Sequence, residues 1–363
     1  MKILRVATFP SLEKRTVGLH AAKLCDIESI KTIFLTSKEL SGRPKIKGNF
    51  SLVEFGKPLE VRSEKQKIYT EFFFILRRIF GLLKFSLYGV WLVLKHKVDI
   101  IHIHSPMYIL IAIFGFLMNK KIYITFHGSE FSRVGRNFQG IKKAWWYKLS
   151  AKIFTRVFSL SDHYIPILSE IHGKNKVISV HNGIDHSIYK NKNLIRKKQI
   201  IAVGSFKEQK GFRYLIEAFS NLKKDNNFKE YILNIIGEGR LRTELTNQID
   251  TLNMSNCIFL PGYKNQEELV NLYNESEVFV LSSLSEGFPK VLLEAIACGC
   301  KIVSTDIDSV QKVLKNKKLA RVGNLDDLTN ILSECILNKN QTNIDLSDFT
   351  WESLRQIYYR EYI

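Results

Sequence analysis

Short apolar runs alternate with longer amphipathic stretches along the whole chain. In the first half, strands are predicted at residues 2–8, 31–36, 50–55, 98–102, 121–126, 158–161 and 176–180. In the second half, they are predicted at 200–203, 231–236, 257–260, 278–281, 301–304 and 319–322. The stretches between them have helical periodicity. Because strand–helix alternation is typical of parallel sheets with helices on both faces, the pattern predicts an α/β fold.

A polar, aperiodic stretch at residues 186–198 separates two such alternations and is the expected interdomain linker. We expect one Rossmann-like domain at residues 1–190, a second at 191–348, and a final helix at 349–363 that packs back toward the first domain. Ligands of open parallel sheets bind beyond the carboxyl ends of the strands. Two such domains facing each other across a cleft are therefore the expected architecture.

The most apolar region, residues 71–94, has two interpretations. Arg77, Arg78 and Lys84 interrupt it, which argues against a membrane span. It can form a pair of core helices, or a helix that presents aromatic and basic side chains to a membrane surface. Residues 141–157 also interleave basic and aromatic side chains, which fits a membrane interface or a nucleic-acid surface equally well.

Charge separates the two halves of the chain more clearly than hydrophobicity does. The net charge is +19. Residues 1–190 hold 31 Lys and Arg against 13 Asp and Glu, which is +18, whereas residues 191–363 hold 23 against 22, which is +1. A basic half attracts anionic lipid, phosphorylated substrates or nucleic acid, so the two halves are expected to have different partners.

The cysteines and the N-terminal residues indicate in which compartment the protein is expected. The five cysteines are scattered, without spacing for zinc or redox chemistry, so we expect reduced thiols in a reducing compartment. The N-terminus is interpreted as a strand rather than a signal peptide. No Ser-His-Asp, Cys-His or zinc-ligand pattern is recognised. Asp306 and Asp308 have the spacing of a metal site, but they are interpreted as surface loop carboxylates.

Residues 286–304, EGFPKVLLEAIACGCKIVS, are the most informative stretch. Pro289 suits the first turn of a helix, Gly299 ends that helix, and a short buried strand follows. Glu294 lies inside the apolar helix, where a carboxylate is costly unless it is paired. Helical rise places it roughly 7–8 Å along the axis from Pro289. Two carboxylates around a helix N-terminus suit a ligand with hydroxyls at both ends and a phosphate between them, which describes a nucleotide sugar.

Other strand ends carry glycines and ionisable residues. Residues 203–211 follow a strand and precede a helix, and Lys210 there can place a cation near a phosphate, although the segment is not a P-loop. Residues 236–239 hold a second glycine pair. His127 follows a buried strand in the other half. By itself it is best interpreted as a loop histidine satisfied by backbone, and its position at a strand end opposite Glu286 strengthens the functional alternative.

The chain resembles glycosyltransferase family 4. The likeness rests on residues 286–304 together with 203–211, 237–239, 127–128 and 182–185, and it runs over nearly the whole chain. Members of this family are two-domain GT-B enzymes that use nucleotide-sugar donors, retain anomeric configuration and generally need no metal. The likeness is strongest in the second half, which binds the donor in that family. The first half, which binds the acceptor there, matches more loosely.

The resemblance implies a role for each matching residue. Glu294 would hold the ribose hydroxyls, Glu286 would lie against the transferred sugar, and Lys210 would neutralise the diphosphate. His127 would approach the sugar from the other domain, so His127, Glu286 and Lys210 are the implied catalytic residues. The implied donor-binding set is Gly18, Gly204, Ser205, Lys210, Gly237, Gly262, Tyr263, Glu286, Gly287, Phe288, Pro289, Lys290, Val291 and Glu294.

Three segments depart from the family pattern. Many members have Arg where Ser205 stands, so part of the phosphate charge must come from Lys210, Lys207 or elsewhere. The first-domain loop often holds two adjacent glycines, but this chain has Gly18 alone. A glycine-rich segment commonly follows the position of Ser304, whereas this chain has TDIDSVQ. Donor contacts at these positions are therefore not predicted in detail.

The expected function is retaining transfer of a hexose or related sugar from a UDP- or GDP-sugar, without a metal or other cofactor, in surface polysaccharide or lipopolysaccharide synthesis. The basic first half favours a lipid-linked glycan acceptor at an anionic membrane. No nucleic-acid partner is expected. The expected location is cytoplasmic, at the inner face of the cytoplasmic membrane. The alternatives are a nucleotide-sugar epimerase or phosphorylase of the same architecture, and a basic membrane- or nucleic-acid-binding protein with a vestigial donor site.

Overall fold

A computed structural model describes residues 1–7, 17–27, 29–36, 50–55, 68–127, 150–315, 317–338 and 344–363, and the side chains of 17–19 and 68–78 are not described. The chain forms two compact units. The first contains Met1–His181 and Trp351–Ile363, and the second contains Asn182–Thr350. Residues 141–149 of the basic and aromatic segment lie outside the described residues, and so does Gly128, which follows His127.

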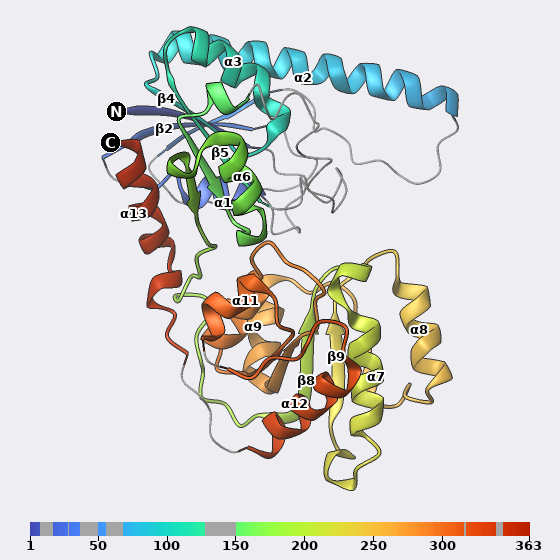
Figure 1. The fold of residues 1–363 in the computed structure, drawn as a ribbon. Coiled ribbons are helices and arrows are strands. Elements are labelled where there is room, and N and C mark those ends of the chain that lie inside the picture. The colour runs from blue at the N-terminus through green and yellow to red at the C-terminus, as the bar shows by residue number, and fades with distance from the viewer. Residues whose placement is uncertain are drawn as a thin grey trace. The chain divides into compact units, whose positions relative to one another are not determined.

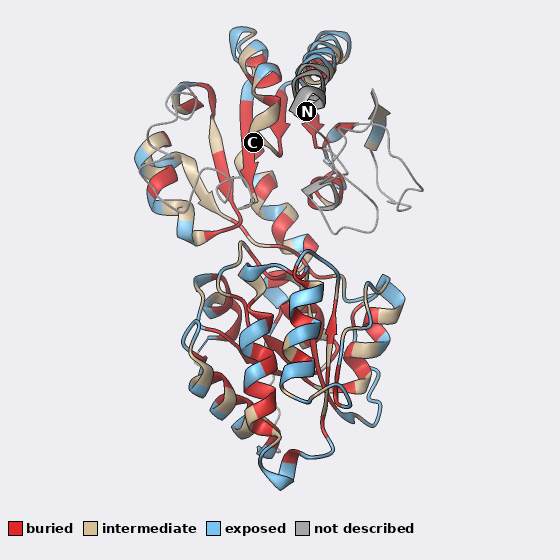
Figure 2. Ribbon diagram, turned by 90° about the vertical axis from the view of Figure 1, so that its right-hand side faces the viewer, coloured by how far each residue is buried: buried red, intermediate tan, exposed pale blue. Residues whose placement is uncertain are grey.

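The first unit is built on a seven-stranded sheet with the order β3-β2-β1-β4-β5-β6-β7 (Figure 1). All neighbouring strands in it are parallel. In spatial order the strands are Phe50–Glu54, Lys31–Thr36, Lys2–Val6, Ile100–Ile103, Lys121–Phe126, Arg156–Ser159 and Val177–Ser179. The inner strands β1, β4 and β5 are buried almost throughout, because helices cover both faces (Figure 2).

The described helices of the first unit are α1 (Val17–Lys23), α2 (Ile68–His96), α3 (Ile109–Leu117), α6 (Ile165–His172) and α13 (Trp351–Tyr362). Residues 71–94 thus belong to one continuous helix, and the expectation of a helix pair is wrong. Gly89 within it lies so close to Ile111 of α3 that a Cβ there would be 2.6 Å from Cδ1. A helical glycine here serves close helix packing rather than a break.

The second unit has a five-stranded parallel sheet with the order β10-β9-β8-β11-β12. These strands are Ile258–Phe259, Ile232–Ile236, Lys197–Val203, Ser276–Leu281 and Lys301–Ser304. Its helices are α7 (Phe212–Leu222), α8 (Arg242–Thr251), α9 (Gln266–Glu275), α10 (Lys290–Ala297), α11 (Asp308–Leu314) and α12 (Leu325–Leu337). The predicted α/β class with parallel sheets is confirmed for both units.

The strand predicted at 319–322 is reduced to a single bridge between Thr305 and Ala320. The second unit begins at Asn182, whose side chain donates to the carbonyl of Phe288 (3.2 Å), and the Ile184 amide donates to the carbonyl of Phe349 (2.8 Å). The expected linker at 186–198 also bonds within this unit, since the Lys192 amide donates to Oδ1 of Asn274 at 2.7 Å.

His172, at the end of α6, makes the first unit sensitive to acid. Its side chain is buried beside Phe154, and neither ring nitrogen has a hydrogen-bond partner. Burial, with a smaller effect of Lys176, lowers its pKa from 6.5 to about 4. The imidazole therefore binds a proton more tightly in the unfolded chain than in the folded one. The contribution of the neutral His172 to the free energy of unfolding is fully present above pH 6.5 and is lost as the pH falls toward 4.

We expect His172→Leu to remove this part of the acid dependence, which amounts to roughly 3 kcal/mol at pH 4. Urea unfolding of wild type and variant between pH 4 and 7.5 measures it. His163→Gln is the matched control, because His163 is exposed in the same unit. Parallel pH curves for wild type and His172→Leu would show that the imidazole does not titrate in this way.

Candidate functional site

The predicted donor residues gather at one edge of the second sheet. Gly204 and Ser205 follow β8, Gly237 follows β9, and Gly262 with Tyr263 follows β10. The segment 286–291 follows β11 and leads into α10. Because these strands are parallel, all their carboxyl ends meet at this edge, where ligands of such sheets bind. The structure therefore brings together every predicted donor residue except Gly18, which lies in α1 of the first unit.

An ion pair between Lys210 and Glu286 forms the centre of this edge. The ammonium of Lys210 contacts Oε1 of Glu286, and the Ser283 hydroxyl donates to the same oxygen at 2.7 Å. The two charged side chains are only 19% and 11% exposed. Partial burial weakens solvent screening, so each charge acts strongly on a group that binds beside it.

Hydrogen bonds join the two loops that carry this pair. The Leu284 amide donates to the carbonyl of Gln209 at 2.8 Å, and the Gln209 side chain donates to the carbonyl of Ser285 at 2.8 Å. The Ser282 hydroxyl donates to the carbonyl of Lys210 at 3.0 Å. Since β8 and β11 are neighbours in the sheet, their following loops start side by side and these bonds fix their spacing.

Glycines make this close approach of loops possible. Gly211 has φ +62°, and a Cβ there would lie 2.1 Å from the carbonyl oxygen of Ser282. A Cβ on Gly204 would be 3.2 Å from Cε of Lys210, so the lysine stem runs directly over this glycine. The glycines of residues 203–211, which alone were a weak signal, thus determine where the ammonium lies.

Glu294 is the buried carboxylate of α10, 3% exposed. The hydroxyl of Tyr273, on α9, donates to its Oε2 at 3.1 Å. The sequence analysis required a partner for Glu294 but did not identify it. The signal was the helical periodicity of α9, which places Tyr273 among its buried residues.

Both ends of α10 are anchored. At the start, the Phe288 carbonyl accepts from Asn182, and the Phe288 ring packs on Phe349 with 5.8 Å between centroids. At the end, the Arg196 guanidinium donates to the Cys298 carbonyl at 2.7 Å, and Gly299 has φ +82°. A cation at a helix C-terminus is stabilising. The helix is therefore held rigidly enough to present Glu294 and its first-turn amides in a fixed geometry.

We expect Glu294→Gln to weaken nucleotide binding at least tenfold with little change in fold. The amide keeps the shape but loses the charge that strengthens a hydrogen bond to a ribose hydroxyl. Tyr273→Phe, which removes only the hydroxyl, should have a smaller effect. Isothermal titration with a nucleoside diphosphate measures both. Equal affinity in wild type and Glu294→Gln would remove Glu294 from the site.

His127 lies in the first unit, directly after β5. Its ring is 5.1 Å from the ring of His20, on α1, and 5.7 Å from the ring of His104, which follows β4. Three imidazoles therefore meet at the carboxyl ends of this sheet. The surroundings of Gly18 are outside the described residues. The roles assigned to His127 and Gly18 toward the donor stay predictions.

A buried arginine beneath these imidazoles was missed by the sequence analysis. Arg5 is fully buried, and its guanidinium lies 3.2 Å from His102 Nδ1, 3.2 Å from His104 Nε2 and 2.9 Å from the Tyr362 hydroxyl. The signal was present: Arg5 interrupts an apolar strand, and the HIH alternation at residues 102–104 places both imidazoles on one face of β4.

The charge of Arg5 fixes the protonation of its neighbours. A guanidinium only donates hydrogen bonds, so His102 Nδ1 and His104 Nε2 accept and both rings are neutral. Burial, helped by Arg5, holds the pKa of His102 well below its usual value, and burial together with His102 and Arg5 does the same for His104. His102 Nε2 lies 2.8 Å from the Thr125 hydroxyl, which lies 2.9 Å from the Tyr358 hydroxyl.

Within the described residues, no group of three or more His, Cys, Asp or Glu is arranged to hold a metal ion. The ring of His20 meets the rings of His104 and His127 edge-on, and the rings of His104 and His127 are tilted by 39° to each other. His20 and His104 are buried, whereas His127 is only partly buried.

The chain is similar to proteins of known class. An uncharacterised glycosyltransferase of Methanocaldococcus jannaschii is 29% identical over 67% of this chain and 66% of its own length. The UDP-Gal:alpha-D-GlcNAc-diphosphoundecaprenol alpha-1,3-galactosyltransferase of Escherichia coli is 28% identical over 66% of each chain. The match thus spans just under two thirds of each relative. The crystal structure of Anabaena HepE with UDP and glucose superposes with a TM-score of 0.73, 14% identity, and coverage of 99% and 98%.

The fold of the chain is the GT-B fold of glycosyltransferases. Residues 185–345 match the family model for glycosyl transferases group 1, and residues 52–188 match the model for Glycosyltransferase Family 4. The chain belongs to glycosyltransferase family 4. The predicted resemblance is confirmed.

Proposed function

We propose that the protein transfers a hexose or related sugar from a nucleoside-diphosphate sugar to a hydroxyl of a lipid-linked glycan, with retention of anomeric configuration. The observation that carries the proposal is the set formed by Lys210, Glu286 and Glu294 at one sheet edge. A cation between two carboxylates suits a diphosphate flanked by a sugar and a ribose. Support for the substrate class comes from the E. coli relative, whose name specifies UDP-Gal and a diphosphoundecaprenol-linked acceptor.

Each residue has a defined part in the reaction. Glu294 accepts hydrogen bonds from the ribose, and Glu286 accepts one from the sugar. As the bond from the anomeric carbon to the diphosphate breaks, Lys210 stabilises the charge that develops on the leaving oxygen. The acceptor oxygen forms the new bond on the same face, and its proton passes to the leaving diphosphate. His127 lines the sugar side in this proposal.

No metal is required in this scheme, because the cation at the diphosphate is Lys210. The proposed location is cytoplasmic, at the inner face of the cytoplasmic membrane, where a lipid-linked acceptor is presented. The proposed pathway is surface polysaccharide or lipopolysaccharide synthesis. No nucleic-acid partner is proposed, since the donor edge lies in the half with a net charge of only +1.

The test is a transfer assay with labelled nucleotide sugars and a polyprenyl-diphosphate glycan. We expect label in the lipid fraction only when both substrates are present, with the anomeric configuration of the donor. Release or epimerisation of the sugar without any acceptor would favour an epimerase or phosphorylase instead. Binding of vesicles without binding of any nucleotide would favour the non-enzymatic alternative.

A further inference from the structure

An apolar face runs along the outside of α2. Six large side chains on it are more than two fifths exposed: Ile79, Phe80, Leu83, Leu87, Trp91 and Leu94. Steps of three and four residues keep them within an arc of roughly 120° on one side of the helix. We call these six residues the α2 stripe. An apolar stripe of this length on a protein surface marks a contact with another apolar phase or partner.

The opposite side of α2 is packed into the first unit. Phe85, Leu92 and Val93 are buried in the same core as the strands, and Gly89 lies against Ile111. The rotation of the helix about its own axis is therefore fixed, and the α2 stripe faces away from the sheet. Figure 1 shows α2 lying along one side of this unit and extending past it.

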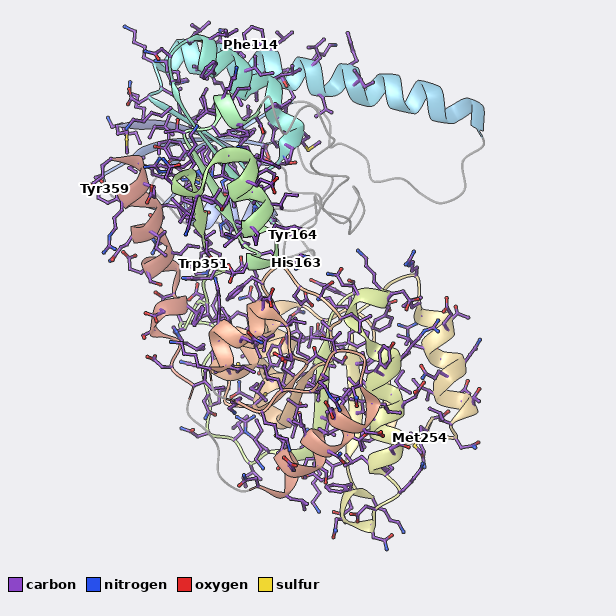
Figure 3. All side chains as sticks on the ribbon, in the orientation of Figure 1. Phe114, His163, Tyr164, Met254, Trp351 and Tyr359 are labelled. Atoms are coloured by element: carbon purple, nitrogen blue, oxygen red, sulfur yellow. The ribbon has the colours of Figure 1, made fainter. Side chains whose placement is uncertain are left out.

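Helix α3 extends the apolar face. Leu110, Phe114 and Leu117 are exposed at the spacing of one helix side, while Ile111 and Gly115 between them are buried. Since α2 and α3 pack side by side through Gly89 and Ile111, their exposed sides form one surface. Figure 3 shows Phe114 on the outer side of α3.

Basic side chains border this surface, and acidic ones are missing from its sequence. Lys84 Nζ lies 4.6 Å from the Phe80 ring, and Lys95 Nζ lies 4.4 Å from the Trp91 ring. Residues 72–98 contain five Lys and Arg and no Asp or Glu, and residues 106–118 carry no charge. Apolar and aromatic side chains edged by lysines are typical of helices that lie in an anionic membrane interface.

Residues Ile79–His96 are long and apolar enough to cross a membrane by length and composition alone. The packing argues against that orientation. A spanning helix contacts lipid on most sides, whereas one side of α2 belongs to a protein core with Phe85 and Leu92 at 5% and 2% exposure. Only an in-plane helix leaves this core intact while its outer side enters the lipid.

We propose that the α2 stripe, with the exposed side of α3, is a membrane-docking surface that inserts into the interface of an anionic bilayer. Lys84 and Lys95 would lie at the headgroup level and the leucines below it. This proposal rests on the proposed function in one respect: a lipid-linked acceptor lies in a membrane, so the enzyme must bind there to reach it. A membrane is preferred over a second protein copy because Lys84 and Lys95 lie against the α2 stripe and would repel the same lysines of a second copy.

The test uses the full-length protein and vesicles of phosphatidylethanolamine with 30% phosphatidylglycerol, about 100 nm across, in a flotation assay. Leu87→Gln/Leu94→Gln removes two exposed apolar side chains from the α2 stripe. Leu194→Gln/Ile195→Gln is the matched control, because these two residues of the second unit are also apolar and are 49% and 98% exposed. Loss of apolar burial should lower the partition coefficient of the stripe variant at least tenfold, and the control should bind like wild type. Lys84→Gln/Lys95→Gln should weaken binding and reduce its salt dependence.

Two results would overturn the proposal. One is equal vesicle binding by wild type and the stripe variant. The other is a wild-type dimer in light scattering that the stripe variant dissociates, which would make this surface a protein interface. Thermal stabilisation by nucleoside-diphosphate sugars is measured on the same samples. If the stripe variant loses vesicle binding but is still stabilised by the nucleotide sugar, its donor site is intact. The membrane proposal and the proposed function are therefore tested separately.

Discussion

Replacement of Lys210 by alanine is expected to lower kcat with a nucleotide-sugar donor by about 100- to 1000-fold, with the fold intact. The ammonium is 19% exposed and has Glu286 as its ionic partner. In our proposal it turns from that carboxylate toward the diphosphate as negative charge develops there. Steady-state transfer rates, with far-ultraviolet circular dichroism as the check on folding, measure the effect.

Lys229→Ala is the control for this variant. Lys229 is exposed in the same unit and precedes β9, so it lies at the opposite edge of the sheet from the donor residues. It should keep kcat within about threefold of wild type, as a surface charge acting through water contributes little. A Lys210→Ala enzyme that turns over at the wild-type rate, or a Lys229→Ala enzyme that is equally impaired, would contradict the role assigned to Lys210.

Gly237→Ala is expected to destabilise the second unit by at least about 3 kcal/mol and to abolish donor binding. Gly237 has φ +147°, and a Cβ there would be 1.8 Å from the carbonyl oxygen of Gly204. The loop after β8 would have to move, and the stem of Lys210 runs over Gly204 in that loop. Urea unfolding and nucleotide titration measure the two consequences.

Gly323→Ala separates this steric effect from backbone strain alone. Gly323 also has a positive φ, +72°, but the nearest atom to an added Cβ is 3.9 Å away, on Tyr214. It should cost only about 1 kcal/mol and leave donor binding unchanged. If both glycine variants lose the same stability, then close packing against Gly204 is not what requires Gly237.

The second sheet and its site could be predicted from sequence because both depend on local pattern. Each strand there is a short apolar run, β8 and β9 are followed directly by a glycine, and parallel topology brings all the strand ends to one edge. Residues 286–304 add a helix start, a buried carboxylate and a helix stop in order. The structure confirms the helix and places Glu294 in its buried side.

Other features depend on contacts between residues far apart in sequence. Arg5 and Tyr362 lie at opposite ends of the chain, and no local pattern pairs them. Helix α13 was expected to return to the first domain, but its tyrosines act as hydrogen-bond partners deep inside it, through Tyr358 to Thr125 and Tyr362 to Arg5. Helix α2 was ambiguous because a 29-residue helix of mainly apolar and basic residues suits a core or a surface equally, and only packing decides which side is buried.

Arg5 also explains why the final helix belongs to the first unit. A buried guanidinium is costly unless its donors are paired, and the Tyr362 hydroxyl adds an acceptor at 2.9 Å to those that His102 and His104 supply. Tyr123 donates to the Glu361 carbonyl at 2.8 Å, and Arg156 forms an ion pair with the Glu361 side chain at 2.7 Å. These contacts make α13 part of the first unit's core, beneath the imidazoles that include His127.

Hydrogen–deuterium exchange with and without a nucleoside-diphosphate sugar tests whether the sheet edge built around Lys210, Glu286 and Glu294 is a donor site. The donor used is the one that gives the largest thermal stabilisation in a panel of UDP-, GDP- and other nucleotide sugars. We expect slower exchange in the segments 204–211, 237–239, 262–263 and 286–294 of the second unit, and loss of that protection in Glu294→Ala. If no nucleotide sugar stabilises the protein, or if exchange in these segments is the same with and without the sugar, then this sheet edge is not a donor site.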